Sequence, residues 1–211
     1  MSGELRIDAG TSAGTFSLDG QTFDVENNIW VVGDDTECVV IDAPHDLEAI
    51  AAVVGPRQVR AVLCTHAHDD HIDLAPMAGE RFAAPTMLHR DDLGLWTLTH
   101  ADFSPNHLLE DGEVITVAGA ELHVLHTPGH SPGSVSAYVP ALETVLTGDT
   151  LFQGGPGATG RSYSDFPTII DSIRERLLAL PPATRVLPGH GASTTIGDEA
   201  PHLQEWIDRG H

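Results

Sequence analysis

The segment Thr65-His66-Ala67-His68-Asp69-Asp70-His71 constrains this chain most strongly. Three histidines and two aspartates fall between residues 66 and 71, directly after an apolar run, Ala61 to Cys64, that is typical of a buried strand. Side chains alternate in an extended segment, so His66 and His68 point the same way, while the last two residues fall where the chain turns. Imidazole and carboxylate groups together suit divalent zinc, manganese or iron. The spacing therefore predicts two adjacent metals rather than one.

Three further strand-like stretches end in a polar residue within a tight turn. These residues are His130 in a Pro-Gly-His-Ser-Pro-Gly turn, Asp149 in a Thr-Gly-Asp-Thr turn and His190 in a Pro-Gly-His-Gly turn. Glycine lets the backbone bend sharply and come close to an ion. Together with the histidine cluster they form a set in which each metal has three protein ligands and shares one carboxylate, which leaves room for a bridging water.

These residues resemble the ligand motif of the metallo-β-lactamase superfamily, and their spacing and flanking residues resemble its glyoxalase II (hydroxyacylglutathione hydrolase) branch. The resemblance runs from about Asn28 to His190 and implies an α/β (α+β) fold, a four-layer αββα sandwich with metals at one edge. It also implies which side chains bind each metal: His66, His68 and His130 the first, Asp70, His71 and His190 the second, and Asp149 both.

Departures from related branches narrow the resemblance. The second site of class B β-lactamases carries a cysteine ligand, which the motif of this chain lacks. Flavodiiron proteins have glutamate at the position of His68. The tRNA-processing ribonucleases act on a polyanion, which a chain with a net charge of −21 would repel. Glyoxalase II continues after its last metal histidine into a helical substrate-binding domain, whereas only residues 191–211 follow His190 here. We therefore expect residues 1–211 to form a single domain of the short type, without that C-terminal domain.

The resemblance implies a metal-dependent hydrolase that cleaves a thioester of a small intracellular thiol. Two metals lower the pKa of a bridging water toward ~7, so that hydroxide attacks the carbonyl at neutral pH. Asp70 is expected to help orient this water if the second metal is weakly held. Zinc is the expected metal, with iron or manganese as alternatives. Glutathione is one candidate carrier, and the lysine-free composition, typical of a GC-rich genome, suggests mycothiol as another.

Other functions remain open at this point. Persulfide dioxygenases resemble this family and use a single iron on the equivalents of His66, His130 and Asp149. A lactonase could use the same metal-activated water. A non-catalytic binding module is the third alternative. Metal content, oxygen uptake with a persulfide and acid release from a homoserine lactone separate these functions.

The composition and net charge limit the classes of partner that the protein is expected to bind. The formal charge is −21, and all ten basic residues are arginine. This acidity argues against nucleic acid and against anionic membrane surfaces as partners. The resemblance implies a small-molecule thioester as the partner. The chain has no apolar run of about 18 residues and no export signal at its start, so we expect a cytoplasmic protein. Cys38 and Cys64 are predicted to be buried, reduced thiols.

Three residues outside the metal motif are weaker candidates for the site. Asp42 follows a strand and is predicted to hydrogen-bond a ligand histidine, with an ordinary turn aspartate as the alternative. Arg161 and Tyr163 follow a glycine-rich loop and are predicted to bind a substrate carboxylate or hydroxyl, with a solvated loop as the alternative. The remaining histidines, including His45, are predicted to be structural or surface residues.

Helices are predicted over residues 46–54, capped by Asp46, over 74–82, over about 165–180, opened by Asp165, and over 198–208. Asp91 or Asp92 is expected to cap a short helix that ends near residue 99. Only weak, short strands are predicted before residue 24, and residues 100–112 are predicted to be irregular.

Overall fold

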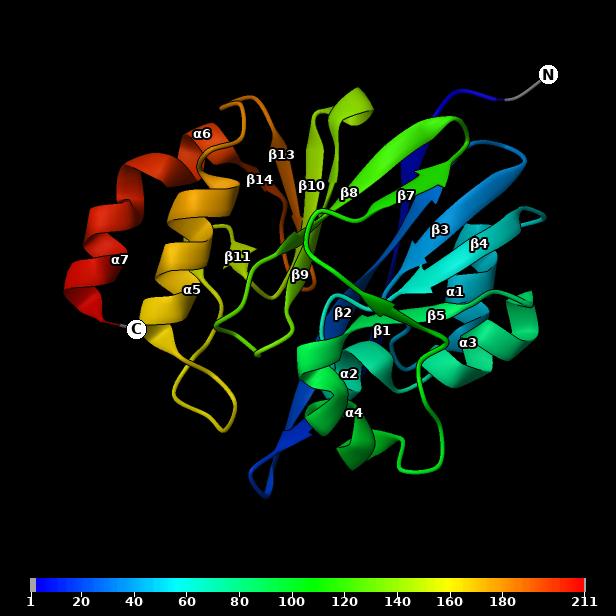
Figure 1. Ribbon diagram of the computed structural model, residues 1–211, viewed down its shortest axis with the longest axis horizontal. Helices are drawn as coiled ribbons and strands as arrows, with labels where there is room; N and C mark the ends of the chain where they lie inside the picture. Colours follow the sequence, from blue (N-terminus) through cyan, green and yellow to red (C-terminus); the bar gives the residue numbers. More distant parts are fainter. Residues whose placement is uncertain (1–2, 211) are drawn as a thin grey trace.

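Two sheets lie face to face in the computed structural model, which describes residues 3–210 (Figure 1). The first sheet has the strand order β1 (Arg6–Leu18), β2 (Gln21–Gly33), β3 (Glu37–Ile41), β4 (Gln58–Leu63), β5 (Thr86–His89) and β6 (His107–Leu109). The second has the order β14 (Thr194–Thr195), β13 (Arg185–Pro188), β10 (Thr144–Gly148), β9 (Val135–Val139), β8 (Ala120–His126) and β7 (Val114–Val117). A small ribbon joins β11 (Leu151–Phe152) to β12 (Gly155–Pro156).

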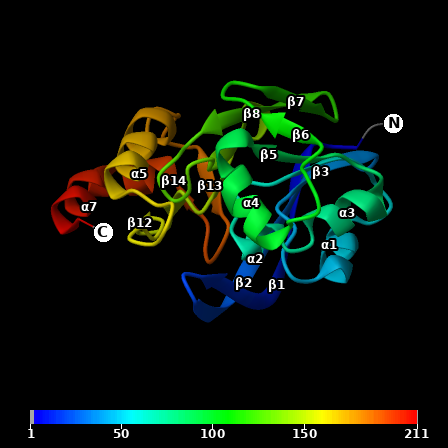
Figure 2. The ribbon, with the colours of Figure 1, turned by 60° about the horizontal axis from the view of Figure 1, so that its bottom comes forward.

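Helices cover the outer face of each sheet. The first sheet carries α1 (Leu47–Val54), α2 (Asp69–Ile72), α3 (Ala75–Phe82) and α4 (Leu93–Thr99). The second carries α5 (Phe166–Ser172), which continues as a π-helical turn (Ile173–Leu177), then α6 (Ile196–Glu199) and α7 (Leu203–Arg209). Figures 1 and 2 show α1 and α3 on the opposite side of the molecule from α5 and α7. This order confirms the predicted αββα fold class.

Three apolar layers hold the sandwich together. In β3, Cys38 and Val40 face the helices, whereas Val39 and Ile41 face the second sheet, and all four are buried. Burial on both faces explains why this strand reads as a continuous apolar run. The third layer lies between the second sheet and α5 and α7, and Trp206 is its largest buried side chain.

Asp46 and Asp165 cap helices as predicted, by accepting hydrogen bonds from the backbone N–H groups of α1 and α5. The prediction that Asp91 or Asp92 caps α4 is wrong. Asp92 stands at the start of this helix, but its side chain makes no capping bond there. Its carboxylate points instead toward two loops at the edge of the sheets.

The largest difference from the sequence prediction is the hairpin of β1 and β2. Its strands pair without interruption from Arg6 opposite Gly33 to Leu18 opposite Gln21, and the turn residues Asp19 and Gly20 both have positive φ. Two such residues are typical of the tight turn that matches the twist of a hairpin. Residues 17–24 are mostly exposed, so the sequence lacks the alternation of buried and exposed residues that marks a strand. The region 100–112 likewise contains β6, which the sequence did not indicate.

Both cysteines are buried and free, as predicted. Burial raises the pKa of the Cys38 thiol to about 11 and that of Cys64 well above its usual value. Each helix within residues 3–210 is too short or too polar to cross a bilayer.

The layer between the sheets makes a quantitative prediction. Leu122 on β8 is fully buried there, so Leu122→Ala should lower the free energy of unfolding by about 2–5 kcal/mol, because a cavity replaces packed atoms. Leu98 is 65% exposed, and Leu98→Ala should change it by less than about 0.5 kcal/mol. Urea denaturation of the metal-free proteins measures both, and equal losses would contradict this layer.

Candidate metal centre

Loops at one edge of the two sheets bring seven predicted ligands together. Four follow β4 at the start of α2 and the other three follow strands of the second sheet: His66, His68, Asp70 and His71, then His130 after β8, Asp149 after β10 and His190 after β13. Gly189 lets the last loop approach closely, because a Cβ atom there would lie 2.4 Å from Asp149 Oδ1. The centre therefore spans the junction of the two sheets.

The first trio is His66, His68 and His130, all of them buried. The Nδ1 atom of His68 lies 3.0 Å from Nε2 of His66 and 3.0 Å from Nε2 of His130. The second carboxylate oxygen of Asp149, Oδ2, lies 3.6 Å from Nε2 of His130. Three imidazole nitrogens thus face a common point, with a carboxylate beside them.

The second trio is Asp70, His71 and His190. Oδ2 of Asp70 lies 3.1 Å from Nε2 of His190 and 3.5 Å from Nε2 of His71. The same carboxylate of Asp149 reaches this trio as well, with Oδ1 3.4 Å from Nε2 of His71 and Oδ2 3.5 Å from Nε2 of His190. Asp149 therefore stands between the two trios.

Hydrogen bonds on the outer side of the rings determine which nitrogen faces the centre. Nδ1 of His130 lies 2.9 Å from the carbonyl oxygen of Ala158, and Nδ1 of His190 lies 2.7 Å from that of Glu26. A carbonyl oxygen only accepts, so each Nδ1 carries a proton and donates it. The neutral ring then presents the lone pair of Nε2 to the centre.

Asp42 orients two further rings. Its Oδ2 atom accepts from Nδ1 of His71 at 2.9 Å and from Oγ1 of Thr65 at 2.9 Å. Because the Thr65 hydroxyl proton goes to Asp42, its oxygen accepts from Nδ1 of His66 at 3.1 Å. His71 and His66 thus also present Nε2 inward, while His68 presents Nδ1. The outer partners are those that orient metal-ligating histidines.

The donor set fits two divalent cations. Five imidazole lone pairs converge with the carboxylates of Asp70 and Asp149. Within residues 3–210, these two carboxylates form ion pairs only with histidines of the two trios. Oδ1 of Asp149 is buried and accepts no hydrogen bond within the described chain. Lone pairs and anions at such distances repel one another unless positive charge lies between them.

The pKa values of histidines in the two trios are shifted in opposite directions. Burial, reinforced by neighbouring histidines, lowers the pKa of His66 well below its usual value and that of His68 to about 3. Burial alone would lower the pKa of His71 too, but the charges of Asp70, Asp149 and Asp42 raise it well above the usual value. The pKa of His190 is likewise raised, because its hydrogen bond to Asp70 and the charge of Asp149 outweigh burial.

Acid should therefore release the metal of the second trio first. His71 and His190 take up protons at a higher pH than ordinary histidines, so affinity there is present above their raised pKa values and falls as the pH decreases through them. His66 and His68 stay neutral over that range. Metal content per chain after equilibration with a weak chelator at each pH measures the order. Release of both ions in one step would contradict it.

Asn27 is a central residue that the sequence did not indicate. Its buried side chain lies among the ligands, where Nδ2 donates to Oδ2 of Asp70 at 3.0 Å. Oδ1 of Asn27 accepts from Nε2 of His45 at 3.0 Å, so His45, predicted to be merely structural or exposed, is joined to the second trio. An asparagine within an ordinary strand gives no sequence signal for such a position.

A cavity of about 290 Å³ opens above the two trios. The apolar part of its wall consists of Phe16, Phe23, Val25, Phe152 and Ala158. The first three of these residues come from the hairpin of β1 and β2. Arg161 lines the same cavity, with its guanidinium carbon 4.7 Å from the centre of the Phe23 ring and Nη1 donating to Oε1 of Gln21 at 3.1 Å. It makes no ion pair with a carboxylate of residues 3–210. Tyr163 is 49% exposed and does not line this cavity.

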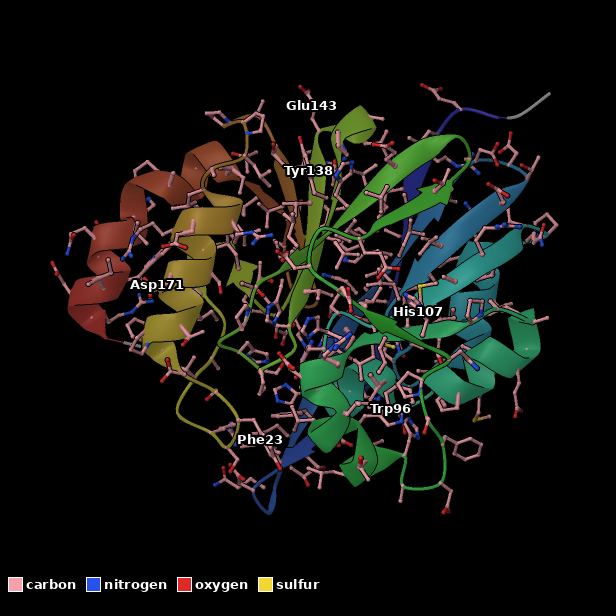
Figure 3. The ribbon with its side chains drawn as sticks, in the orientation of Figure 1. Phe23, Trp96, His107, Tyr138, Glu143 and Asp171 are labelled. Atoms are coloured by element: carbon pink, nitrogen blue, oxygen red, sulfur yellow. The ribbon has the colours of Figure 1, made fainter. Side chains whose placement is uncertain are left out.

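The far end of the hairpin is fastened to its surroundings. The carboxylate of Asp69 accepts from the backbone N–H of Ser17 at 3.0 Å, and Oδ2 of Asp19 accepts from that of Ser162 at 3.0 Å. Figure 3 shows Phe23 near this end of the hairpin, beside the loop that leads to α5. The cavity wall is thus tied both to the histidine cluster and to the loop of Arg161.

Another histidine cluster lies outside this centre and does not suit a metal. Possible ligand atoms of His89, Asp91 and His126 lie within 4.8 Å of one another. However, the rings of His89 and His126 are stacked, with centres 4.0 Å apart and planes 15° apart. Lone pairs lie in the ring planes, so those of two nearly parallel rings do not converge on one ion. We interpret this cluster as a packing contact between the ends of β5 and β8.

The sequence profile of the metallo-beta-lactamase superfamily matches residues 23–190, which include all seven predicted ligands. The chain belongs to this superfamily. The probable metallo-hydrolase YqgX of Bacillus subtilis is 34% identical over 190 residues, which are 82% of this chain and 88% of that protein. The hydroxyacylglutathione hydrolase GloC of Haemophilus influenzae is 31% identical over 186 residues, 81% of this chain and 87% of the relative.

Solved structures of the superfamily agree with this assignment. BLEG-1, a B3 metallo-beta-lactamase, has a TM-score of 0.77 and 31% identity, with 91% of this chain and 98% of that chain covered. TTHA1623 in a di-iron-bound form has a TM-score of 0.73 and 35% identity, with 83% and 93% covered. The superfamily and its fold are confirmed, and the clusters fit its dinuclear metal site. The glyoxalase II branch stays a prediction.

Proposed function

We propose that this superfamily member hydrolyses a thioester of a small intracellular thiol, as a glyoxalase II-like enzyme. The observation that carries the proposal is the convergence of five oriented imidazoles and the shared Asp149 carboxylate at the floor of an apolar cavity. The similarity to a relative named hydroxyacylglutathione hydrolase supports the choice of substrate class.

Within this proposal, the two trios hold one metal ion each and Asp149 contacts both. Zinc is the proposed metal, with iron or manganese as alternatives, because histidine and carboxylate ligands suit all three. Two such cations would supply a hydroxide nucleophile at neutral pH and polarise the carbonyl of the substrate. The chain itself contributes the fixed direction of each imidazole and, at Oδ2 of Asp70, an acceptor that orients the proton of the attacking water.

The lining of the cavity contains no serine, cysteine or lysine that could act as a nucleophile. Cys64 is fully buried, and burial raises the pKa of its thiol well above the usual value. A covalent acyl intermediate on serine, cysteine or lysine therefore has no candidate residue among the lining, which favours direct attack by water.

The cavity suggests how a thioester would lie. At about 290 Å³ it is at the small end of ligand pockets, so it suits an acyl group and the sulfur end of the carrier, with the rest of the carrier outside. Phe16, Phe23 and Phe152 would contact the acyl chain. Arg161 stands at the wall, where its guanidinium makes no ion pair with a carboxylate of residues 3–210, and would bind a carboxylate of the carrier, with Tyr163 offering a hydroxyl further out. Glutathione and mycothiol are the proposed carriers.

The proposal is tested by the release of free thiol from S-lactoylglutathione and other acyl thiols by metal-loaded protein. We expect turnover that disappears on chelation and returns with metal. Asp149→Asn should reduce kcat/KM by more than the ~10–100-fold typical of a lost outer partner of a metal ligand, because it removes a donor from both trios. Absence of thiol release from every acyl thiol, including S-acyl mycothiol, would overturn the substrate class.

The same protein preparation distinguishes the alternatives. One iron per chain with oxygen uptake on a persulfide would identify a dioxygenase, and acid release from a homoserine lactone would identify a lactonase. The sequence set class B β-lactamases apart because they carry a cysteine ligand, but the similarity to BLEG-1 places a chromogenic cephalosporin among the substrates to be tried.

Arg161 gives a prediction about substrate recognition. Arg161→Gln should raise KM for carboxylate-bearing acyl thiols by about 10-fold with little change in kcat, because a hydrogen bond to a charged group is lost in both ground and transition states. Steady-state kinetics measures the two parameters separately. Arg185→Gln is the matched control, because Arg185 is exposed and lies outside the cavity. A fall in kcat at constant KM would contradict this role.

A further inference from the structure

The carboxylate of Asp92 is fully buried and accepts three hydrogen bonds. Oδ2 accepts from the backbone N–H of Ala67 at 2.8 Å and from Oγ of Ser131 at 2.7 Å. Oδ1 accepts from the backbone N–H of Gly133 at 2.6 Å. Within residues 3–210 this carboxylate makes no ion pair, and N–H and O–H donors of two loops stabilise it.

These two loops carry the whole first trio. Ala67 stands between His66 and His68, and Ser131 directly follows His130. The first loop follows a strand of the first sheet and the second joins two strands of the second sheet. One carboxylate thus ties together the backbone of both loops at positions next to all three ligands.

Asp92 itself is held in place by close packing. A Cβ atom on Gly133 would lie 2.6 Å from the backbone nitrogen of Asp92, so only glycine allows this approach. The stacked rings of His89 and His126 join the same two segments a few residues away. Nε2 of His126 donates to the carbonyl oxygen of Pro132 at 2.9 Å, which fixes the loop from the other side.

The second trio has a different carboxylate. Asp42 accepts from Nδ1 of His71, whereas none of the hydrogen bonds of Asp92 reaches Asp70, His71 or His190. Asp92 therefore acts on the loops of the first trio alone, whereas Asp42 acts on the ring of His71 and, through Thr65, on the ring of His66 as well.

We propose that Asp92 is a positioning residue for the first trio, which sets the metal affinity of that site independently of the second. The inference rests on the dinuclear centre of the proposed function but not on the thioester. In Asp92→Asn, one carboxylate oxygen becomes an amide N–H₂ group. In one orientation of the amide this group faces the N–H of Gly133, and in the other it faces the N–H of Ala67. In both cases two buried hydrogen-bond donors face each other and neither has an acceptor. The loops then separate and the three imidazoles no longer meet at one point.

Metal affinity measured one site at a time tests the proposal. Zinc is titrated into metal-free protein against a competing chelating indicator, in a His190→Ala background that leaves the first trio intact and in a His130→Ala background that leaves the second intact. Asp92→Asn should weaken binding about 10-fold in the first background and less than about twofold in the second. Asp91→Asn, the same change at a half-exposed neighbour, should alter neither.

A second variant covers the case in which Asp92→Asn does not fold, which melting of the metal-free protein reveals. Ser131→Ala removes one of the three hydrogen bonds of Asp92, together with the hydrogen bond of 2.8 Å between the hydroxyl groups of Ser131 and Ser134. It should weaken the first site about threefold, which corresponds to the loss of a hydrogen bond of modest strength. Cobalt absorption provides an independent readout, since a displaced histidine changes the visible spectrum of the first site but not of the second.

Equal weakening in both backgrounds, or an equal effect of Asp91→Asn, would overturn the proposal, as would unchanged affinity in Asp92→Asn and Ser131→Ala. Failure of the wild-type protein to bind two zinc ions would overturn it together with the dinuclear centre. A protein that binds two ions, shows the predicted asymmetry and cleaves no thioester would support this inference and reject the substrate class alone.

Discussion

The direction of five imidazole lone pairs is the constraint on which the centre depends. A histidine ring has two nitrogens, and the one that carries the proton is decided by the partner on the far side. Here those partners are backbone carbonyls of Ala158 and Glu26 and the Asp42–Thr65 pair, which orient four of the five rings. Nε2 of His68, the fifth ring, has no hydrogen-bond partner within residues 3–210. For the other four rings the fold itself selects the tautomer. The ligand atoms are thereby arranged before any ion arrives, which reduces the reorganisation that binding requires.

The position of the centre follows from the sandwich. Each sheet supplies part of both trios, and the apolar layer between the sheets fixes the distance from β4 to β10 and β13. Asp149 can contact both trios because its turn lies between the two groups of loops. Asp92 then acts locally on the first trio, and Asp42 acts on His71 of the second trio and, through Thr65, on His66. Packing of the two sheets thus sets the distance between the ligand loops, and hydrogen bonds set the positions of individual ligands within them.

The sequence predicted the parts of the site that local chemistry marks. A burst of histidines after an apolar run, and single polar residues in glycine-rich turns, identified all seven side chains that the fold brings together. The hairpin of β1 and β2 was not predicted, because residues 17–24 around its turn are mostly exposed and lack the alternation that marks a strand. Asn27 and Asp92 were not predicted because their roles arise from contacts with residues far away in the chain, such as Asp70 and Ser131. Asp92 even carried a misleading local signal, that of a helix cap.

The hairpin has an evolutionary consequence. Phe23 and Val25 line the cavity from an element whose shape is maintained by backbone pairing and by contacts at its far end. Neither side chain belongs to the trios or to the hydrogen bonds that orient them. Substitutions at these two positions therefore remodel the entrance while leaving the reacting groups intact. A lineage that inherits this scaffold can therefore change which ligands enter the cavity through substitutions at these two positions, under little constraint from the chemistry below them.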